Sequence, residues 1–460
     1  MARSLSRPSL QGNAWIAPLL RQAKRFLTTS SLLSLARVAG ALAGFVTQVV
    51  LARTLHASAL GVFYSVTSLA AVVGLMAAHG YPAIAPRFMS RYREQGKSNL
   101  IAAFVARARK DAAVYVVIAT AAVLGIAVFW PSLGFEARLA TAAAALSIPA
   151  NASLRLNGSL AAAIRRFALA YLPDTCIRPF VLLGGVLILI AAGVTLTASN
   201  VTLLLTVVFT GLALTQYLLL RKDVPATGEA AQEAPPRLVR IWRREATPLI
   251  LVALFTYFFA DVDILLVTPL LPSADTAIVG LCLKLALLVG FAVQVAHQVV
   301  VPDLADAHAR KQHGAIRDVA LKALAFPLAV TVSALVVVAL WGETLLALFG
   351  PEFTGAKIPL LILLGCQFAR AVFGPNVPLL TVIGAQRLNA ALAVSALVVL
   401  ALANLVLVPA YGVLGAALAV AIATVFWLAA CSVMLARLSG LRTDAVYLLG
   451  RLIAARQAQA

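Results

Sequence analysis

Residues 388–435 read LNAALAVSALVVLALANLVLVPAYGVLGAALAVAIATVFWLAACSVML and contain no charged side chain. A surface helix of a soluble protein needs a polar face, whereas a helix that is apolar all round lies inside a large protein or a membrane. About 20 apolar residues cross a bilayer. The stretch is long enough for two crossings, and Pro409-Ala410-Tyr411 separates its halves. We predict one membrane-spanning helix at 388–408 and a second at 412–435.

The rest of the 460-residue chain has the same character. Hydrophobic residues make up 62% of the sequence and charged residues only 12%, against about 25% charged in an ordinary soluble domain. The composition predicts an all-α polytopic membrane protein of about twelve transmembrane helices. The other ten predicted spans are 31–53, 58–80, 111–130, 138–160, 179–197, 201–220, 247–270, 275–299, 322–341 and 357–382.

The basic residues indicate the orientation. A net charge of +20 would suggest nucleic-acid binding in a soluble protein. Here thirty of the 37 Lys and Arg residues lie in the two terminal segments and in every second connection between apolar runs. Connections rich in Lys and Arg stay in the cytoplasm. We therefore predict that both termini are cytoplasmic, and we expect no nucleic-acid partner.

The longest inner connection lies near the middle of the chain and divides it into two halves. We predict a cytoplasmic N-terminal arm at 1–30, an N-lobe of six helices at 31–220, a cytoplasmic linker at 221–246, a C-lobe of six helices at 247–436 and a cytoplasmic tail at 437–460. Two parallel halves with an even number of helices place a substrate site between them.

No motif for soluble chemistry is present. The four Cys and five His residues have no metal-ligand spacing, so we expect no metal site. The outer connections are all short, so we expect no external catalytic domain and no enzyme activity.

Three segments carry a resemblance to a known family: LARVAG at 35–40, continuing through VVLARTL at 49–55 to LGVFY at 60–64; IGAQRLN at 383–389; and NLVLVPAYGVLGAA at 404–417. In order and spacing they resemble the O-antigen and exopolysaccharide flippases of the multidrug/oligosaccharidyl-lipid/polysaccharide exporter superfamily. The resemblance covers nearly the whole chain.

The resemblance implies two six-helix lobes around a central cavity, working by alternating access in the bacterial inner membrane. The implied cargo is an undecaprenyl-pyrophosphate-linked oligosaccharide, flipped to the periplasmic leaflet for lipopolysaccharide or exopolysaccharide synthesis. The expected partners are this lipid and the membrane lipids, with a polysaccharide polymerase or chain-length regulator as a further candidate. We expect a monomer without a cofactor, with Na⁺ or H⁺ as the candidate coupling ion.

Three arginines within the predicted spans are candidates for binding the pyrophosphate: Arg37, Arg155 and Arg370. A charge at the centre of a bilayer costs about 2.5–3.5 kcal/mol on insertion scales, so it needs a cavity, a partner or a route to the interface. Arginine pairs bidentately with phosphate oxygens. The alternative for Arg37 and Arg155 is that each side chain reaches the inner interface. Arg370 lies too deep for that.

A second set of charges lies in the outer half of the membrane. Asp261 and Asp263 have depths matching that of Lys284 on the next span, so Lys284 can pair with one aspartate. Residues two apart on a helix face different directions. The second aspartate is therefore a candidate for cation coupling or proton relay.

A candidate hinge lies at Gly374-Pro375-Asn376-Val377-Pro378, because Gly and Pro interrupt a helix.

Three other functions stay open. A cation-coupled multidrug antiporter needs a carboxylate in its cavity, and Asp261 and Asp263 keep this function open. A lipid II flippase often has two more helices after the twelfth, where this chain has a short tail. A membrane-embedded polysaccharide polymerase, which belongs to another class, typically has a large outer loop or an acidic interfacial motif. Neither is found here.

Overall fold

The computed structural model describes residues 16–131, 133–223, 235–310, 313–440, 444, 445 and 447. The predicted arm at 1–30 and tail at 437–460 therefore lie partly outside the described residues, as does the linker segment 224–234. Within the described residues the chain is helical and contains no strand. The all-α prediction is confirmed.

The described residues of the first half of the chain form eight α-helices and one π-helical turn. They are α1 (Ile16–Thr54), α2 (Ala57–Ala77), α3 (Tyr81–Glu94), α4 (Ser98–Phe129), α5 (Phe135–Ala163), α6 (Phe167–Leu172), the π-helical turn η1 (Pro173–Ile177), α7 (Arg178–Ala191) and α8 (Ala198–Leu220).

The second half begins with a long helix that continues from the linker. Its elements are α9 (Pro236–Val267), α10 (Ser273–Ala309), α11 (His313–Ala347), the 3₁₀ turn η2 (Pro351–Ala356), α12 (Lys357–Phe373), α13 (Asn376–Val382) and α14 (Gln386–Ser439). The predicted hinge at 374–378 coincides with a break between α12 and α13, where Gly374 has a φ of 68°. Its role as a hinge stays a prediction.

Nine helices in the described part of the chain are long and apolar enough to cross a membrane, and a bent pair within α9 gives a tenth. Two features explain why fewer spans are counted here than the twelve predicted from the sequence. Gly412, inside the 54-residue α14, has non-helical angles (φ 56°, ψ −131°), so α14 covers both predicted spans at 388–408 and 412–435. The helix α5 covers the predicted span 138–160 but is less apolar, because it carries polar residues such as Asn151 and Asn157 that are buried in the protein.

The corner at Gly412 requires close contact between the two arms of α14. A Cβ atom on Gly415 would lie 2.1 Å from the carbonyl oxygen of Leu407, which no real Cβ atom could tolerate. Because glycine has no Cβ, the backbone can approach itself here. The sequence stretch quoted first is therefore a helical hairpin and not one continuous helix.

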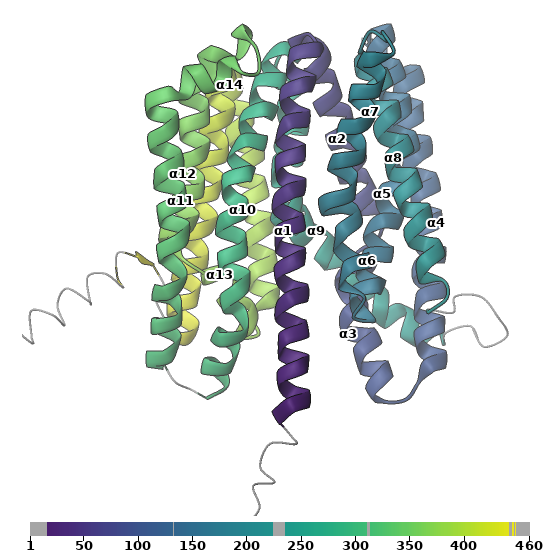
Figure 1. Ribbon diagram of the computed structural model, residues 1–460, viewed down its shortest axis with the longest axis vertical. Coiled ribbons are helices and arrows are strands. Elements are labelled where there is room, and N and C mark those ends of the chain that lie inside the picture. The colour runs from purple at the N-terminus through teal and green to yellow at the C-terminus, as the bar shows by residue number, and fades with distance from the viewer. Residues whose placement is uncertain are drawn as a thin grey trace, which may run out of the picture.

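The helices form two groups (Figure 1): α2–α8 lie on one side, α10–α14 lie on the other, and α1 runs between them. Large apolar side chains on the outside of this arrangement are exposed, for example Phe129 at 81% and Val406 at 70%. Soluble proteins rarely expose so much apolar surface. The exposed surface therefore suits contact with lipid.

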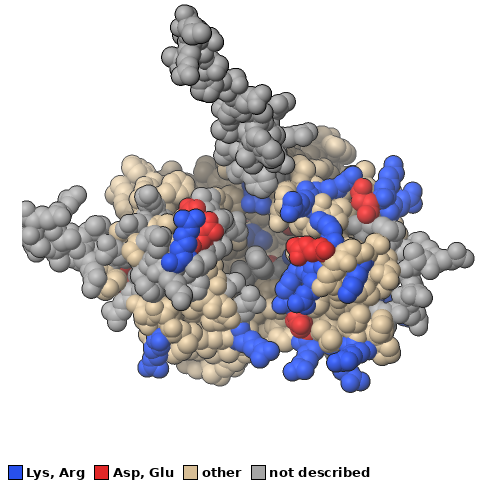
Figure 2. Space-filling view, turned by 90° about the horizontal axis from the view of Figure 1, so that it is seen from below, with Lys and Arg blue, Asp and Glu red and all other residues tan. Residues whose placement is uncertain are grey.

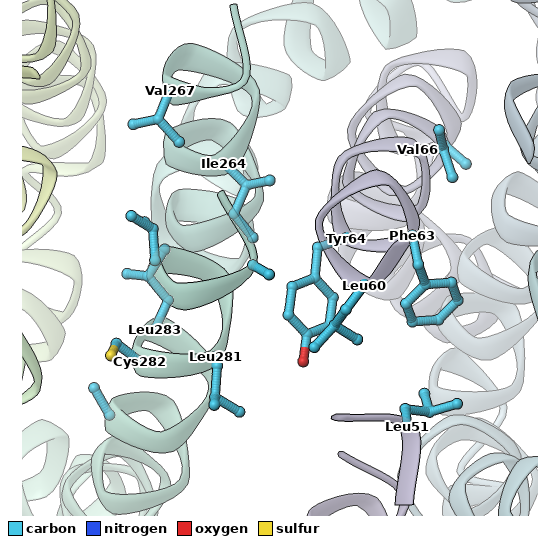
Figure 3. Close-up of a cluster of buried hydrophobic side chains, with 14 of the residues drawn as sticks. Leu51, Leu60, Phe63, Tyr64, Val66, Ile264, Val267, Leu281, Cys282 and Leu283 are labelled. Carbon is cyan, nitrogen blue, oxygen red and sulfur yellow. The ribbon is translucent and has the colours of Figure 1, made fainter. Parts of the chain in front are cut away.

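The two groups pack tightly at the end where α1 passes into α2, called the outer end here after the predicted orientation. Figure 3 shows Leu60 and Tyr64 on the side of α2 that faces α9 and α10, whereas Phe63 and Val66 point to the other side. A Cβ atom on Gly61 would lie 1.7 Å from the carbonyl oxygen of Ser273. Glycine is thus required where α2 meets α10.

Hydrogen bonds strengthen this closure. Arg53 at the end of α1 donates to the carbonyl oxygens of Leu348 (2.7 Å) and Ala347 (2.9 Å), at the C-terminus of α11. A cation is favourable there, because the last carbonyls of a helix carry partial negative charge. Ser65 and Thr268 share a hydrogen bond of 2.9 Å between α2 and the end of α9.

The opposite end, at the α3–α4 connection, is called the inner end. Seen from below (Figure 2), the surface is hollowed between the two groups of helices, and basic side chains lie inside the hollow. The hollow opens at the end of the molecule that the charge distribution assigns to the cytoplasm. The division into lobes at 31–220 and 247–436 stays a prediction.

The predicted linker at 221–246 is not wholly a linker, because α9 begins at Pro236. Trp242 is completely buried and donates from Nε1 to the hydroxyl of Tyr92 (2.9 Å). Its ring packs edge-on against Phe104, with centroids 5.1 Å apart. Residues 236–246 therefore form a helix that packs on the first group of helices.

Candidate substrate and ion sites

Charged side chains from both groups of helices meet between them. This central charge cluster consists of Arg155 on α5, Asp174 on η1, Arg178 on α7, Asp261 on α9 and Lys284 on α10. Arg155 interacts electrostatically with Asp174, Arg178 and Asp261, and Asp261 also interacts with Lys284. Three positive and two negative charges are thus brought together within the membrane.

Local structure positions the Asp174–Arg178 pair. The π-helical turn at Pro173–Ile177 connects α6 to α7 without leaving the helical path, which places both residues on one side of the chain. Arg178 Nε lies 3.2 Å from Asp174 Oδ1, and the side chains are 36% and 51% exposed. The guanidinium group of Arg178 also lies 5.3 Å from the ring centroid of Phe209. Both side chains are therefore accessible enough for Arg178 to bind another anion in place of Asp174.

Asp261 and Lys284 join the cluster from the second group of helices. Ser68 of α2 donates to Asp261 Oδ1 at 2.9 Å, and Lys284 Nζ lies 4.9 Å from the ring centroid of Tyr64. Asp261 and Lys284 attract each other electrostatically, although in the described structure no direct ion pair joins them. The predicted proximity of Lys284 to one of the two aspartates is thus present, and that aspartate is Asp261.

Asp263 faces a different environment, as the helical spacing predicted. It is fully buried, and its Oδ1 accepts a hydrogen bond from Asn404 Nδ2 at 2.8 Å. Neither Asp263 Oδ2 nor Asn404 Oδ1 has a hydrogen-bond partner. The space beside Asp263 is otherwise apolar, lined by residues such as Leu283 and Leu363. Asp263 Oδ2 and Asn404 Oδ1 are therefore both available to bind a small cation, and the Asp263 carboxylate can also accept a proton.

The three arginines predicted to bind pyrophosphate do not converge. Only Arg155 lies in the central charge cluster. Arg37 lies on α1 with its guanidinium carbon 4.9 Å from the ring centroid of Tyr171, and its buried Nε has no partner. Arg370 lies in a separate pocket within the second group of helices, 5.7 Å from the ring centroid of Trp427. The structure thus places Arg370 apart from the central charge cluster.

Four residues of these sites were missed from the sequence. Arg178 and Asp174 were placed in a cytoplasmic connection, because the segment 161–178 contains three basic residues; their spacing of four, directly before an apolar run, is the signal of a helical ion pair. Asn404 lay inside a quoted family segment without a role. Ser68 carried no signal, because a single serine is common in membrane helices.

No family model and no curated protein sequence matches the chain. Solved structures do. Lipid II flippase MurJ in its inward closed conformation has a TM-score of 0.68 at 14% identity, with 88% of this chain and 87% of that chain covered.

Two multidrug transporters have similar folds. MATE multidrug transporter DinF-BH, solved as a complex, has a TM-score of 0.60 at 15% identity, covering 95% of this chain and 98% of that chain. An inward-facing MATE family transporter of the MOP superfamily has a TM-score of 0.59 at 16% identity, covering 94% and 96%.

The chain has the fold of these transporters. Each of the three is named as a flippase or a transporter, and none as an enzyme. All three have low sequence identity, so the similarity establishes the architecture and leaves the cargo to the chemistry of the sites.

Proposed function

We propose that the chain is a transporter that flips an undecaprenyl-pyrophosphate-linked oligosaccharide from the cytoplasmic to the periplasmic leaflet of a bacterial inner membrane. The observation that carries the proposal is the central charge cluster, where Arg155, Arg178 and Lys284 outnumber Asp174 and Asp261. Excess positive charge away from bulk water attracts an anion strongly. The fold similarity to a lipid II flippase supports a lipid-linked cargo.

The cluster suggests how the cargo is exchanged. Without cargo, Arg178 pairs with Asp174, which lowers the cost of holding an arginine within the membrane. A pyrophosphate group entering from the hollow at the inner end replaces the carboxylate as the partner of the guanidinium group, because phosphate oxygens also match its fork of donors. Closure of the inner end and opening of the outer end then release the cargo on the other side.

We propose different roles for Arg37 and Arg370. Arg37 on α1 has a partly exposed side chain and an unpartnered Nε, so it is a candidate for a first contact with the pyrophosphate. Arg370 lies in its own pocket and would contact the lipid carrier only if the carrier reached that pocket. Lys284 and Asp261 are proposed to hold α9 and α10 together and to be charge partners of the cargo.

Coupling to Na⁺ or H⁺ is proposed to occur at Asp263. An ionised carboxylate buried in a membrane is costly unless a cation or proton neutralises it. Asp263 and Asn404 together provide two unpartnered oxygens, which are the ligand type that hard cations prefer. The same carboxylate is the observation that favours the second candidate function, a cation-coupled multidrug antiporter.

The test is a flipping assay in proteoliposomes with a fluorescent pyrophosphate-linked oligosaccharide in the membrane. We expect the Arg155→Gln and Arg178→Gln variants to flip at least about tenfold more slowly, because each loses charge-assisted hydrogen bonds worth about 1.5–3 kcal/mol. Arg437→Gln, which changes an exposed arginine in the last turn of α14, is the matched control.

Cargo identity is tested in the same vesicles. Lipid II and an organic cation replace the oligosaccharide in parallel assays. Faster movement of lipid II would assign the lipid II flippase function, and movement of the organic cation alone would assign the drug antiporter. Unchanged flipping in both arginine variants would contradict the role of the central charge cluster.

A further inference from the structure

A second pocket lies within the C-terminal group of helices, apart from the central charge cluster. It has a cavity volume of about 60 Å³ and opens to the surroundings, and α9, α10, α12 and α14 all contribute to its wall. We call it the Arg370 pocket. Its apolar wall contains aliphatic side chains and three aromatic rings, those of Phe255, Phe259 and Trp427.

The aromatic rings form a connected wall. Phe255 packs edge-on against Trp427, with ring centroids 4.6 Å apart, and edge-on against Phe259 at 5.1 Å. Phe255 and Phe259 stand on either side of the bend that divides α9 into 236–255 and 259–267 at an angle of 72°. Residues four apart on a helix lie on one face, and both rings line the pocket. An aromatic or isoprenoid body would be buried favourably against them.

Two hydrogen-bond donors of the pocket, on Arg370 and Trp427, are poorly satisfied, and Gln367, Thr424 and Cys366 are the other polar residues of its wall. The guanidinium group of Arg370 makes one long contact of 3.5 Å with Gln367 Oε1, and no carboxylate lies at ion-pair distance from it among the described residues. Trp427 is 5% exposed, and its indole Nε1 is buried with no hydrogen-bond partner. Asp263 belongs to the adjoining space beyond Leu283 and Leu363.

A purely structural role accounts poorly for these donors. The contact with the Trp427 ring holds the arginine but leaves its charge uncompensated, and a buried N–H group without an acceptor is costly. An anion bound in the pocket would compensate the charge of Arg370 and accept a hydrogen bond from the indole N–H of Trp427. A guanidinium group and an indole N–H are each donors only, so they select an acceptor such as a carboxylate or a phosphate.

We propose that the Arg370 pocket binds an amphipathic organic anion, with its carboxylate or phosphate against Arg370 and Trp427 and its apolar body against Phe255 and Phe259. This site is separate from the central charge cluster and goes beyond the proposed flipping activity. The anionic group could belong to a free organic acid or to the pyrophosphate of a lipid carrier, because the chemistry of recognition is the same.

Calorimetric titration of the purified full-length protein in detergent tests the proposal, with naphthoate as the probe and the neutral naphthylmethanol as its uncharged counterpart. We expect naphthoate to bind, and naphthylmethanol to bind at least about tenfold more weakly. Arg370→Gln should weaken naphthoate binding by at least about tenfold, whereas Arg370→Lys, which retains the charge but not the fork, should weaken it less.

Two further variants keep the test decisive. Trp427→Phe keeps a smaller aromatic ring but removes the N–H donor, and we expect it to weaken naphthoate binding by several-fold and more than it weakens naphthylmethanol binding. Arg437→Gln should bind as the unmodified protein does, which controls for partition of the probe into the micelle. Equal naphthoate binding by the unmodified protein, Arg370→Gln and Trp427→Phe would overturn the proposal.

Competition identifies the source of the anion. Displacement of naphthoate by farnesyl pyrophosphate would support the pocket as a docking site for a lipid carrier. Failure of farnesyl pyrophosphate to displace bound naphthoate would support a site for free organic acids. Arg155→Gln and Arg178→Gln should leave naphthoate binding unchanged, so failure of this proposal and failure of the flipping proposal give different results.

Discussion

At the scale of single residues, the two aspartates of α9 show how about half a turn of helix places two carboxylates in different surroundings. Asp261 turns towards Ser68 and Lys284 between the two groups of helices. Asp263, two residues later, turns into the second group and contacts Asn404. The sequence predicted this divergence, because positions two apart on a helix cannot share a face. It could not predict which aspartate meets Lys284, since that depends on the rotation of α9.

Asp263 is the residue whose replacement tests ion coupling. We predict that Asp263→Asn removes the response of transport to a Na⁺ or H⁺ gradient, because the amide cannot carry the charge that a cation or proton neutralises. The measurement is flipping in proteoliposomes under an imposed gradient of each ion in turn. Loss of the response to one gradient identifies the ion.

The control for this substitution is Glu343→Gln, which alters a carboxylate that is 71% exposed. Surface ion pairs contribute little, so this variant should keep the response to the gradient. Full gradient dependence in Asp263→Asn would contradict a coupling role for this carboxylate.

The surroundings of the arginines were predicted less completely than those of the two aspartates. Depth within a predicted span identified Arg370 as a residue needing a cavity, and it does line a pocket. Depth could not show that this pocket is separate from the site of Arg155, because the lateral arrangement of helices is set by tertiary packing. Arg178 was missed because its span begins earlier than the apolar run, at Phe167, and continues through the π-helical turn.

At the scale of elements, α9 connects the two groups of helices. Its lower part is held to the first group by Asp111 of α4, which accepts hydrogen bonds from Arg243 Nε (2.9 Å) and Nη2 (2.7 Å) and from the hydroxyl of Tyr81 (2.6 Å). Arg107 completes the network at 2.9 Å from Asp111. A further ion pair joins Arg87 and Glu245. The upper part of α9 belongs to the second group.

We predict that Asp111→Ala destabilises the protein by about 1.5–3 kcal/mol, because it removes the buried charged acceptor that Arg243, Arg107 and Tyr81 share. The midpoint of thermal unfolding in detergent should fall clearly. Tyr81→Phe removes a single donor and should cost only about 1 kcal/mol. If the two substitutions had equal effects, Asp111 would not be the centre of the network.

The sequence could not reveal this role of α9. Residues 236–246 are rich in arginine and follow a segment with prolines and glycine, which is typical of a linker. The helix forms because Trp242 and Arg243 find buried partners on α3 and α4, and such long-range contacts leave no periodic signal in a short basic segment. The elements predicted correctly are those with long apolar runs, whose burial in lipid does not depend on distant partners.

At the scale of the whole molecule, the structure is closed at the outer end and hollow at the inner end. The closure depends on contacts between α1, α2, α10 and α11, which the proposed transport cycle would have to break. Arg53 contributes through its hydrogen bonds to the end of α11. The proposed alternating access requires two arrangements of the groups that differ by a few kcal/mol, and substitutions at the outer contacts should then shift the balance between them.

We predict that Arg53→Gln loosens the outer end without unfolding the protein. With Cys176, the one native cysteine that is not fully buried, replaced by serine, a cysteine introduced at Ser65 should react slowly with a membrane-impermeant maleimide. Adding Arg53→Gln should increase the labelling rate several-fold, because the exposed arginine no longer caps α11. An unchanged rate would show that packing alone holds the outer end.

Gly61 provides the sharpest test of the closed arrangement. A Cβ atom there would lie 1.7 Å from the carbonyl oxygen of Ser273, whereas a Cβ atom on Gly44 would meet no atom within 4 Å. We predict that Gly61→Ala disfavours closure of the outer end, so that the inner ends approach each other instead. Spin labels at Gln95, on the α3–α4 connection, and at Asp303, near the inner end of α10, should report a shorter distance.

Gly44→Ala is the matched control, because it makes the same chemical change in another helix with no clash. Its spin-label distance should equal that of the labelled protein without the glycine substitution. A shortened distance in Gly61→Ala together with reduced flipping would connect the outer contact to the transport cycle, since a protein that cannot close its outer end cannot reload from the inner side. An unchanged distance in Gly61→Ala would mean that α2 and α10 can separate slightly without moving the two groups, and the closure would then depend on Arg53 and the end of α11.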